Sequence, residues 1–315
     1  MDGTLTLADG STLDDLLTFY WHNNNALAAY PTQRVLRAIW MAMRTLHQQN
    51  SVNRAKQHAR SHYDLPAEFY RLFLDDGLNY SCGYFRSPAD RLETAQAAKH
   101  AHAIAKLAIA SGMRVLEIGG GWGQFAIELA RAGARVVSLN VSAEQVALAV
   151  ERAREAGVGD RIDFVVEDYR EHQGAYDRVV SVGMMEHVGA AYLKAYFTAV
   201  CEFLAPDGYA FVHSIGRMCQ PGTTAPFLRK YVFPGGYTPA LSETLAAIEK
   251  CDLWCADVEV LRLHYAYTIR HWRERFGANR DKVRELYDER FCRMWEFYLA
   301  AVETSFTDGD QMVFQ

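Results

Sequence analysis

The chain has 315 residues, 50% of them hydrophobic, and a formal net charge of −5 at pH 7 with histidine neutral. This is enough to bury a core, either in one large α/β domain or in a main domain with an appendage. The negative balance argues against a basic footprint over the whole surface, so no nucleic-acid partner is expected.

The first segment, residues 1–59, is expected to be helical after a short start at Gly3–Leu7 that is typical of a strand-pair remnant. From Thr18 to Tyr63 there is no aspartate or glutamate. The basic residues of this stretch are Arg34, Arg37, Arg44, Arg54, Lys56 and Arg60. A basic stretch on an acidic protein indicates a local anionic partner.

A helix is predicted to begin at Pro31, because apolar side chains recur at helical spacing from Val35 to Leu46 with arginines beside them. Two interpretations stay open: a packed helix with a solvated face, or an interfacial helix that rests on anionic lipid. No apolar run approaches the roughly 20 residues that span a bilayer, and no secretory signal is expected. We expect a cytoplasmic protein, associated peripherally with the inner face of the membrane.

The cysteines are scattered and form no CxxC pair: Cys82, Cys201, Cys219, Cys251, Cys255 and Cys292. Neither a zinc site nor a disulfide framework is expected from this spacing, and reduced thiols are the simpler interpretation.

From about Leu107 the pattern alternates between strands and helices, which predicts a mostly parallel sheet. Helices are expected over Trp122–Arg131 and over Ser142–Ala156, the second capped by Ser142. A helix-rich stretch is expected over Tyr267–Phe306. The predicted strands are Arg114–Ile118, Arg135–Leu139, Ile162–Val166, Asp177–Val182 and Tyr209–His213, with two late edge strands at Val258–Leu263 and Met312–Phe314.

A glycine-rich turn, Glu117-Ile118-Gly119-Gly120-Gly121-Trp122-Gly123, joins the first of these strands to the first helix. Glycines let the backbone come close to a ligand, although such a turn also fits a dinucleotide fold. Two acids favour S-adenosylmethionine (SAM). Glu117 can organise the loop around the amino-acid end of the cofactor, and Asp168, followed by Tyr169, can accept a hydrogen bond from the adenine amino group.

An acid for the ribose hydroxyls is expected about 20 residues further on, at the end of the second strand. Asn140 stands there. Its amide can still bind a hydroxyl, or the residue can simply turn the chain. Gln145, in the helix that follows, completes the set of residues predicted to bind the cofactor.

Further motifs stand on both sides of this turn. They are His62-Tyr63-Asp64-Leu65, Phe69-Tyr70, Leu78–Phe85, Gly183–Gly189, His213–Gly216, Tyr231–Gly236 and His264–Thr268. With them the chain, from about Ala59 onward, closely resembles the cyclopropane-fatty-acyl-phospholipid synthase family, which includes the mycolic acid cyclopropane synthases.

The resemblance implies a Rossmann-like, seven-stranded SAM-dependent methyltransferase domain over residues 60–315, with an inserted helical region that binds the acyl chain or forms a lid. Residues 1–59 would form a partial N-terminal region that associates with lipid or membrane. Met1–Leu17 resembles the tail end of the N-terminal domain of longer members, and the last predicted strand is short, so a chain shortened at both ends is an expectation. A homodimer is a further expectation.

The family transfers a methyl from SAM to a cis double bond of a lipid acyl chain; the resulting carbocation loses a proton from the new methyl and closes to a cyclopropane. The resemblance implies a bound bicarbonate ion as the base. Its matching ligands here are the backbone amides of Cys82 and Ile215 and the side chains of Glu186, His213 and Tyr265. Glu186 would share a proton with the ion, because two bare anions repel each other.

Aromatic faces can stabilise the cationic stages; the candidates are Tyr80, Trp122, Phe233, Tyr265 and Tyr267. The resemblance also places Tyr80 and Ser81 at the methionine end of the cofactor. An apolar slot for the acyl chain is expected among Tyr192, Phe197, Phe227, Leu228, Tyr231 and the stretch Tyr287–Phe306, although the sequence does not separate the slot from core packing for any of them.

The chain departs from the family pattern at several positions. Gly120 stands where a cysteine is usual, Pro66-Ala67 replaces Gly-Asn, Ala225 replaces an asparagine, and Asn140-Val141 replaces a Thr-Leu pair. We expect methylation of unsaturated phospholipid acyl chains that ends in a cyclopropane. The alternatives are a C-methyltransferase that makes methyl-branched or methylene fatty acids, an N-methyltransferase that acts on a small amine, and a non-enzymatic lipid-binding scaffold.

Overall fold

The computed structural model describes residues 2–4, 6–44, 48 and 65–315. The predicted motif His62-Tyr63-Asp64 and the basic residues Arg54, Lys56 and Arg60 lie outside the described residues.

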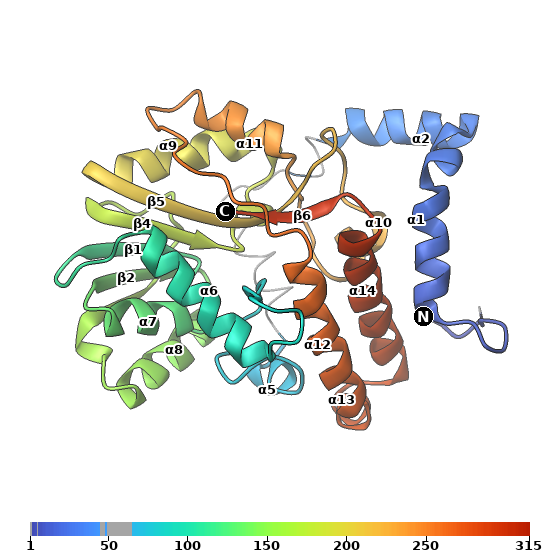
Figure 1. Cartoon of the computed structure of the whole chain (residues 1–315), viewed down its shortest axis with the longest axis horizontal. Coiled ribbons are helices and arrows are strands. Elements are labelled where there is room, and N and C mark those ends of the chain that lie inside the picture. Colours follow the sequence, from blue (N-terminus) through green and yellow to red (C-terminus); the bar gives the residue numbers. More distant parts are fainter. Residues whose placement is uncertain (1, 5, 45–47, 49–64) are drawn as a thin grey trace.

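A twisted sheet of six strands forms the centre of the molecule, in the order β3-β2-β1-β4-β5-β6 (Figure 1). The first five strands are parallel and β6 runs antiparallel to β5. The strands are β1 Arg114–Ile118, β2 Arg135–Asn140, β3 Ile162–Val166, β4 Tyr176–Val182, β5 Leu204–Arg217 and β6 Gln311–Phe314. The predicted α/β class and the order of strands and helices are confirmed.

The expected seventh strand is wrong. In Val258–Leu263, Leu261 makes a backbone hydrogen bond to Val313 of β6 and Glu259 to Gln315 just after it, but only an isolated bridge between Val260 and Phe314 forms. The segment turns into helix α12 at His264, so it runs beside β6 too briefly to become a regular strand.

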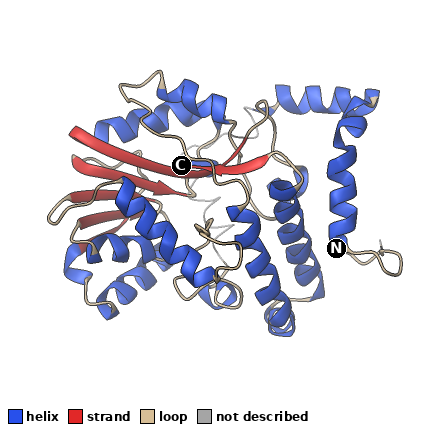
Figure 2. Cartoon of the chain, viewed as in Figure 1, coloured by secondary structure: helices blue, strands red, loops and turns tan. Residues whose placement is uncertain are grey.

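Helices cover both faces of the sheet, because alternate strand residues point to opposite sides. Leu116 and Ile118 of β1 belong to a core cluster with α9 (Leu193–Phe203). Val115 belongs to another cluster, with α7 (Gln124–Arg131). Figure 2 shows these two helical layers with the sheet between them. Three more helices complete the layers: α6 Leu92–Lys106, α8 Ala143–Glu155 and α11 Leu241–Ile248.

A third group of helices packs beside the carboxyl ends of the strands around an aromatic core. It consists of α5 Ala67–Tyr70, α10 Pro226–Tyr231, α12 His264–Ala278, α13 Arg280–Leu286 and α14 Glu289–Thr307. Phe69 and Trp295 meet edge to face at 4.9 Å in this core, and Trp272 is fully buried. The predicted helix-rich stretch is therefore confirmed, although it begins at His264.

The N-terminal helices α1 (Leu13–Ala29) and α2 (Pro31–Ala42) lie at the edge of the molecule (Figure 1). The described residues among Gly3–Leu7 form no strand, so that expectation is wrong. The side chain of Thr12 caps α1, and α2 begins at Pro31 as predicted.

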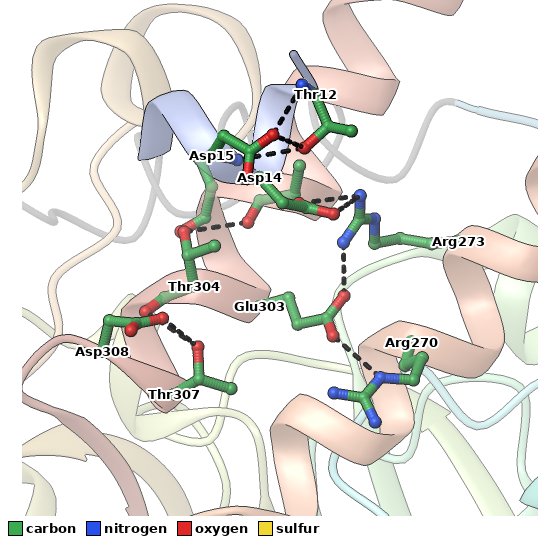
Figure 3. A network of polar contacts seen from close by, with 11 residues as sticks. Thr12, Asp14, Asp15, Arg270, Arg273, Glu303, Thr304, Thr307 and Asp308 are labelled. Atoms are coloured by element: carbon green, nitrogen blue, oxygen red, sulfur yellow. Dashed lines mark hydrogen bonds and ion pairs between the residues drawn. The ribbon is translucent and has the colours of Figure 1, made fainter. Parts of the chain in front are cut away.

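Ion pairs join α1 to the third group of helices (Figure 3). Arg273 of α12 contacts Asp14 of α1 at 2.9 Å and Glu303 of α14 at 2.6 Å. Glu303 is buried and also accepts a hydrogen bond from Arg270 at 3.0 Å. A buried carboxylate is tolerated only when it is paired, so this network fixes α1 against the main domain.

Candidate active site

A cavity opens at the carboxyl ends of β1, β2 and β4, where open α/β sheets bind ligands. Its empty volume is about 1340 Å³, including space open to solvent. The cofactor residues predicted from the sequence line it, with the exception of Gly123: Tyr80, Ser81, Glu117, Gly119, Gly121, Trp122, Asn140, Gln145, Asp168 and Tyr169. Residues from four stretches of the chain, 80–81, 117–122, 140–145 and 168–169, therefore converge on one space.

The glycine-rich turn has backbone conformations that residues with a side chain rarely adopt. Gly119, Gly121 and Gly123 have φ values of 86°, 52° and 81°, in the left-handed region that favours glycine. A Cβ added at Gly121 would meet nothing within 4 Å, whereas one at Gly123 would lie 2.7 Å from the Cβ of Ala149. Gly121 therefore presents its backbone to the cavity, and Gly123 lets α7 and α8 pack closely.

Gly120, which departs from the family pattern, is complemented by Ser138 on β2. A Cβ at Gly120 would lie 2.0 Å from Ser138 Oγ and 2.8 Å from Glu117 Oε2. The Ser138 hydroxyl donates to Glu117 Oε2 at 2.6 Å. The serine thus occupies the space of the missing side chain and holds the acid of the turn.

Glu117 is 4% exposed, and its burial raises its pKa to about 7, against the hydrogen bond from Ser138 and the charge of Lys99. An acid in this state can exist in either protonation form near neutral pH. A ligand cation placed beside it would favour the charged form.

The end of β2 carries an amide pair in place of the expected acid. Asn140 Nδ2 donates to the carbonyl of Gly121 at 3.0 Å and to Gln145 Oε1 at 2.9 Å. Its Oδ1 accepts from the Ser142 amide at 3.1 Å. Gln145 is 4% exposed, and its Nε2 has no hydrogen-bond partner among the described residues. Asn140 therefore organises the loop, and Gln145 carries the donor that a ribose hydroxyl can satisfy.

Asp168 is buried, and its carboxylate pairs with the guanidinium of Arg170. The Arg170 guanidinium donates from Nε to Oδ1 at 2.8 Å and from Nη2 to Oδ2 at 2.7 Å. Each carboxylate oxygen has further lone pairs. Asp168 can therefore still accept from an adenine amino group while Arg170 fixes its position.

Two buried polar residues of α6 were missed by the sequence reasoning. Lys99 and His100 both line the cavity. Lys99 Nζ donates to Ser81 Oγ at 2.8 Å, and the His100 ring stacks on Phe125 at 4.9 Å. The sequence does contain a signal for them. Gln96, Lys99 and His100 lie at helical spacing with Leu92, Ala95 and Ala103, on the face of α6 that is buried.

None of the predicted catalytic residues lines the cavity itself, but Cys82 follows Ser81 and Glu186 precedes His187, both of which do. Glu186, in the turn η2 (Met185–His187), is joined to β5, because the Ile215 amide donates to Glu186 Oε1 at 2.7 Å. Glu186 Oε2 is buried and, within the described chain, has no hydrogen-bond partner. Burial raises the Glu186 pKa to about 7, and the hydrogen bond from Ile215 opposes this shift.

His213 of β5 is 2% exposed, and its Nδ1 lies 3.0 Å from Nε2 of Gln315. Burial lowers its pKa to about 3, with contributions from the positive charge of Lys99 and from His264. The imidazole is therefore neutral at pH 7, and Nε2 is the ring nitrogen left for a ligand.

Cys82 and Tyr265 belong to the buried aromatic core. Burial raises the pKa of the Cys82 thiol strongly, so the sulfur stays protonated at neutral pH. The neighbouring Gly83 amide donates to Thr268 Oγ1 at 3.0 Å, on the same helix as Tyr265. The Tyr265 ring meets Phe306 edge to face at 5.0 Å. The described contacts thus join Glu186 to Ile215 and bring the Cys82 segment against α12.

These observations fit SAM. The turn offers its backbone to the cavity, Glu117 lies at one end, and the buried Gln145 and His100 carry Nε2 atoms that have no partner in the described part of the chain. The fold and this site define a SAM-dependent methyltransferase. The chain belongs to the mycolic acid cyclopropane synthetase family, whose model matches residues 50–315.

Two curated relatives illustrate this membership. The tuberculostearic acid methyltransferase UfaA1 of Mycobacterium tuberculosis is 37% identical over 293 residues, which are 89% of this chain and 69% of that protein. The cyclopropane-fatty-acyl-phospholipid synthase of Escherichia coli K12 is 36% identical over 257 residues, 81% of this chain and 66% of that protein. The chain thus spans about two thirds of the length of these relatives.

Solved structures agree with the fold. The cyclopropane synthase MmaA2 from Mycobacterium tuberculosis has a TM-score of 0.78 at 28% identity, covering 82% of this chain and 96% of that one. The mycolic acid cyclopropane synthase CmaA1, complexed with SAH and CTAB, has a TM-score of 0.77 at 27% identity, with the same coverage. Coclaurine N-methyltransferase covers 96% of this chain and 93% of that one with a TM-score of 0.77, but at 19% identity it shows the fold alone.

Proposed function

We propose that this protein transfers a methylene from SAM to the cis double bond of unsaturated phospholipid acyl chains, forming cyclopropane fatty acids. The observation that carries the proposal is the buried Glu186 with its raised pKa and its bond to Ile215. We assign the cofactor to the cavity-lining residues that the sequence predicted, with Gly123 shaping the turn. Bound SAM supplies an electrophilic methyl, and its addition to a double bond leaves a cation that must lose a proton.

The acid–base properties of Glu186 suit it to hold a proton acceptor such as bicarbonate. With a pKa of about 7, roughly half of the Glu186 side chains are protonated at neutral pH. A protonated carboxyl donates a hydrogen bond to an oxyanion, whereas an ionised one repels it. The buried Oε2, which lacks a partner among the residues described, is the atom that would make this bond.

The other proposed ligands act as donors. His213 is neutral at pH 7 and, with Nδ1 engaged by Gln315, can donate from Nε2. Tyr265 would donate a hydrogen bond to the anion from its phenolic hydroxyl, and Cys82 would donate one from its backbone N–H. The Ile215 amide is engaged by Glu186, so its proposed contact with the anion requires sharing that hydrogen bond.

Aromatic rings near the cavity would stabilise the cation without acting as nucleophiles. Tyr80 and Trp122 line the cavity, and Tyr70 packs against both rings, at 5.3 and 4.8 Å. Phe233 packs on Tyr298 at 5.7 Å, and Tyr267 meets Phe85 at 5.6 Å. We therefore assign the cation to Tyr80 and Trp122 rather than to Phe233 or Tyr267.

An exposed stripe on α2 supports approach to a membrane. Val35, Leu36 and Ile39 are 60%, 45% and 47% exposed, and Arg34 and Arg37 are exposed beside them. Apolar side chains flanked by arginines suit an anionic lipid surface. No helix among the described residues is long and apolar enough to cross a membrane.

One segment leads from this stripe to the cavity. The Arg229 guanidinium of α10 lies 6.0 Å from the ring centre of Trp40, and Phe227 meets Phe297 of α14 at 4.8 Å. A few residues on, Pro234 and Gly235 line the cavity. We assign residues 226–236 to the entry path of the acyl chain. Phe197, another candidate for the slot, is 3% exposed in the core between α9 and the sheet and is not part of this path.

A second candidate keeps the cofactor and changes the product. A C-methyltransferase that makes methylene or methyl-branched fatty acids is favoured by the 37% identity to a protein named tuberculostearic acid methyltransferase. Both reactions begin with methyl addition to a double bond, and they differ in whether a ring closes.

Incubation with SAM and vesicles of monounsaturated phospholipid separates the candidates. Mass analysis should show acyl chains heavier by one CH2 that take up no hydrogen under mild catalytic hydrogenation. Chains that gain CH2 and still take up hydrogen, or chains that gain CH2 plus two hydrogen atoms, support the second candidate. Methyl transfer to a soluble amine, with none to acyl chains, would contradict both.

A further inference from the structure

Lys99 is a buried cation beside the proposed cofactor, and the function proposed above assigns it no role. It lies on α6, is 2% exposed and lines the cavity. Removing an ammonium group from water is unfavourable unless it is paired. Burial lowers the Lys99 pKa to about 8, although the negative charges of Asp75 and Glu117 oppose this shift. A group kept in such a position calls for an anionic partner.

The contact between Lys99 and Ser81 sets the direction of the serine hydroxyl. An ammonium group only donates hydrogen bonds, so Ser81 Oγ is the acceptor of the 2.8 Å bond. Gln96, one turn earlier on α6, donates to the Ser81 carbonyl at 2.9 Å. With its oxygen engaged and its backbone held, Ser81 can direct its own proton into the cavity that it lines. Two of the three ammonium donors remain for a ligand, since Ser81 takes one.

Lys99 and Glu117 both line the cavity and carry opposite charges that interact with each other. Each lowers the cost of ionising the other. An α-amino acid carries the same two charges in reverse, an ammonium and a carboxylate on one carbon. A zwitterion placed between them would match both charges and bury no net charge.

We propose that Lys99, together with the Ser81 hydroxyl, binds the carboxylate at the amino-acid end of the cofactor, while Glu117 takes its ammonium group. This inference rests on the proposed function, because it assumes that SAM occupies the cavity. It adds a specificity device: the site recognises the amino-acid end by charge and does not depend on the adenosine alone.

Calorimetry with two ligands tests this assignment. S-adenosylhomocysteine carries the amino-acid end, whereas 5′-methylthioadenosine keeps the adenosine and lacks that end. Lys99→Met, a neutral side chain of similar length, should weaken S-adenosylhomocysteine binding about 10- to 100-fold, the range for a lost bond to a charged group. Its affinity for methylthioadenosine should stay within about threefold of the wild type.

Lys106→Met, on the same helix but paired with Asp257 and Glu259, is the matched control and should change neither affinity. Equal losses for both ligands in Lys99→Met would assign Lys99 a structural role and overturn the proposal. So would a loss that appears only when bicarbonate is added, because Lys99 would then hold the free anion.

If Lys99→Met does not fold, Ser81→Ala should weaken S-adenosylhomocysteine alone, and unchanged binding would refute the assignment. Wild-type protein that binds neither ligand would instead contradict the proposed function.

Discussion

Gly120 and Ser138 should be energetically coupled, because one leaves the space that the other fills. Gly120→Ala places a Cβ 2.0 Å from Ser138 Oγ, where real Cβ contacts essentially never fall below 3.0 Å. The serine must move by about 1 Å, at a cost of about 1–3 kcal/mol for overpacking. That movement also breaks its 2.6 Å bond to Glu117, which adds about 1–3 kcal/mol for a buried acid left unpaired.

Ser138→Ala alone incurs only the second cost. In the double variant the nearest contact becomes Glu117 Oε2 at 2.8 Å, the mobile end of a side chain that Ser138 no longer holds. The double variant should therefore match Ser138→Ala and be more stable than Gly120→Ala by about 1–3 kcal/mol. The coupling energy of the cycle equals the whole cost of Gly120→Ala, about 2–6 kcal/mol.

Thermal unfolding followed by circular dichroism measures this cycle, at roughly 2 °C per kcal/mol for a chain of this size. Gly277→Ala is the control, because the added Cβ would meet nothing within 4 Å, and it should cause no loss. Effects of the two substitutions that simply add, within about 0.5 kcal/mol, would refute the complementarity.

Three further predictions concern Glu186 and α2. Glu186→Gln keeps the shape of the side chain but cannot take up or release a proton, so turnover should fall about 100-fold with S-adenosylhomocysteine affinity unchanged; wild-type rates would contradict the site. The folded pKa of Glu186 is raised, so its contribution to stability is full below the unfolded pKa of 4.5 and is lost as pH rises through about 7. The unfolding free energy of Glu186→Gln minus that of the wild type, measured with urea, should therefore increase by about 2–3 kcal/mol from pH 5 to pH 8. Parallel pH profiles of the two proteins would refute this shift. Replacing Arg34 and Arg37 by Gln should weaken sedimentation with anionic vesicles about 30-fold, at ~1 kcal/mol per arginine; equal binding to neutral vesicles would argue against an electrostatic contact.

The sequence predicted the sheet well where a short apolar run lies between clear boundaries. Arg114–Ile118 and Ile162–Val166 agree with β1 and β3 at both ends, because turns and helix caps bound a short apolar run there. β5 extends beyond the predicted Tyr209–His213 at both ends, and at its carboxyl end the extension pairs with β6. That partner comes from the far end of the chain and leaves no local signal.

The sequence brings the residues proposed for the cofactor together more readily than those proposed for proton transfer. The glycine-rich turn and Asp168 each follow the carboxyl end of a strand, so the parallel sheet brings them to the same edge, where both line the cavity. Lys99 was missed because a lysine on a helix is usually solvated; only its place on the buried stripe of α6 distinguishes it. The contact between Glu186 and Ile215 joins a short turn to a strand and depends on tertiary packing.

Basic residues in the N-terminal stretch differ in role more than their composition indicates. Arg44 pairs with Glu243 near the start of α11 and lies over the ring of Tyr237, so it is engaged within the protein. Arg34 and Arg37 remain exposed on α2, and Arg37 also donates to Asn24 Oδ1 of α1 at 3.0 Å. Charge counting identified the stretch, but the structure is needed to select the arginines that face outward.

The most direct test of the central claim uses SAM with a fully deuterated methyl group and vesicles of monounsaturated phospholipid. Ring closure after loss of a methyl proton predicts an acyl product that carries two of the three deuterium atoms and takes up no hydrogen under mild hydrogenation. An acyl product that keeps all three deuterium atoms, or label found in a soluble amine and absent from lipid, would contradict the account.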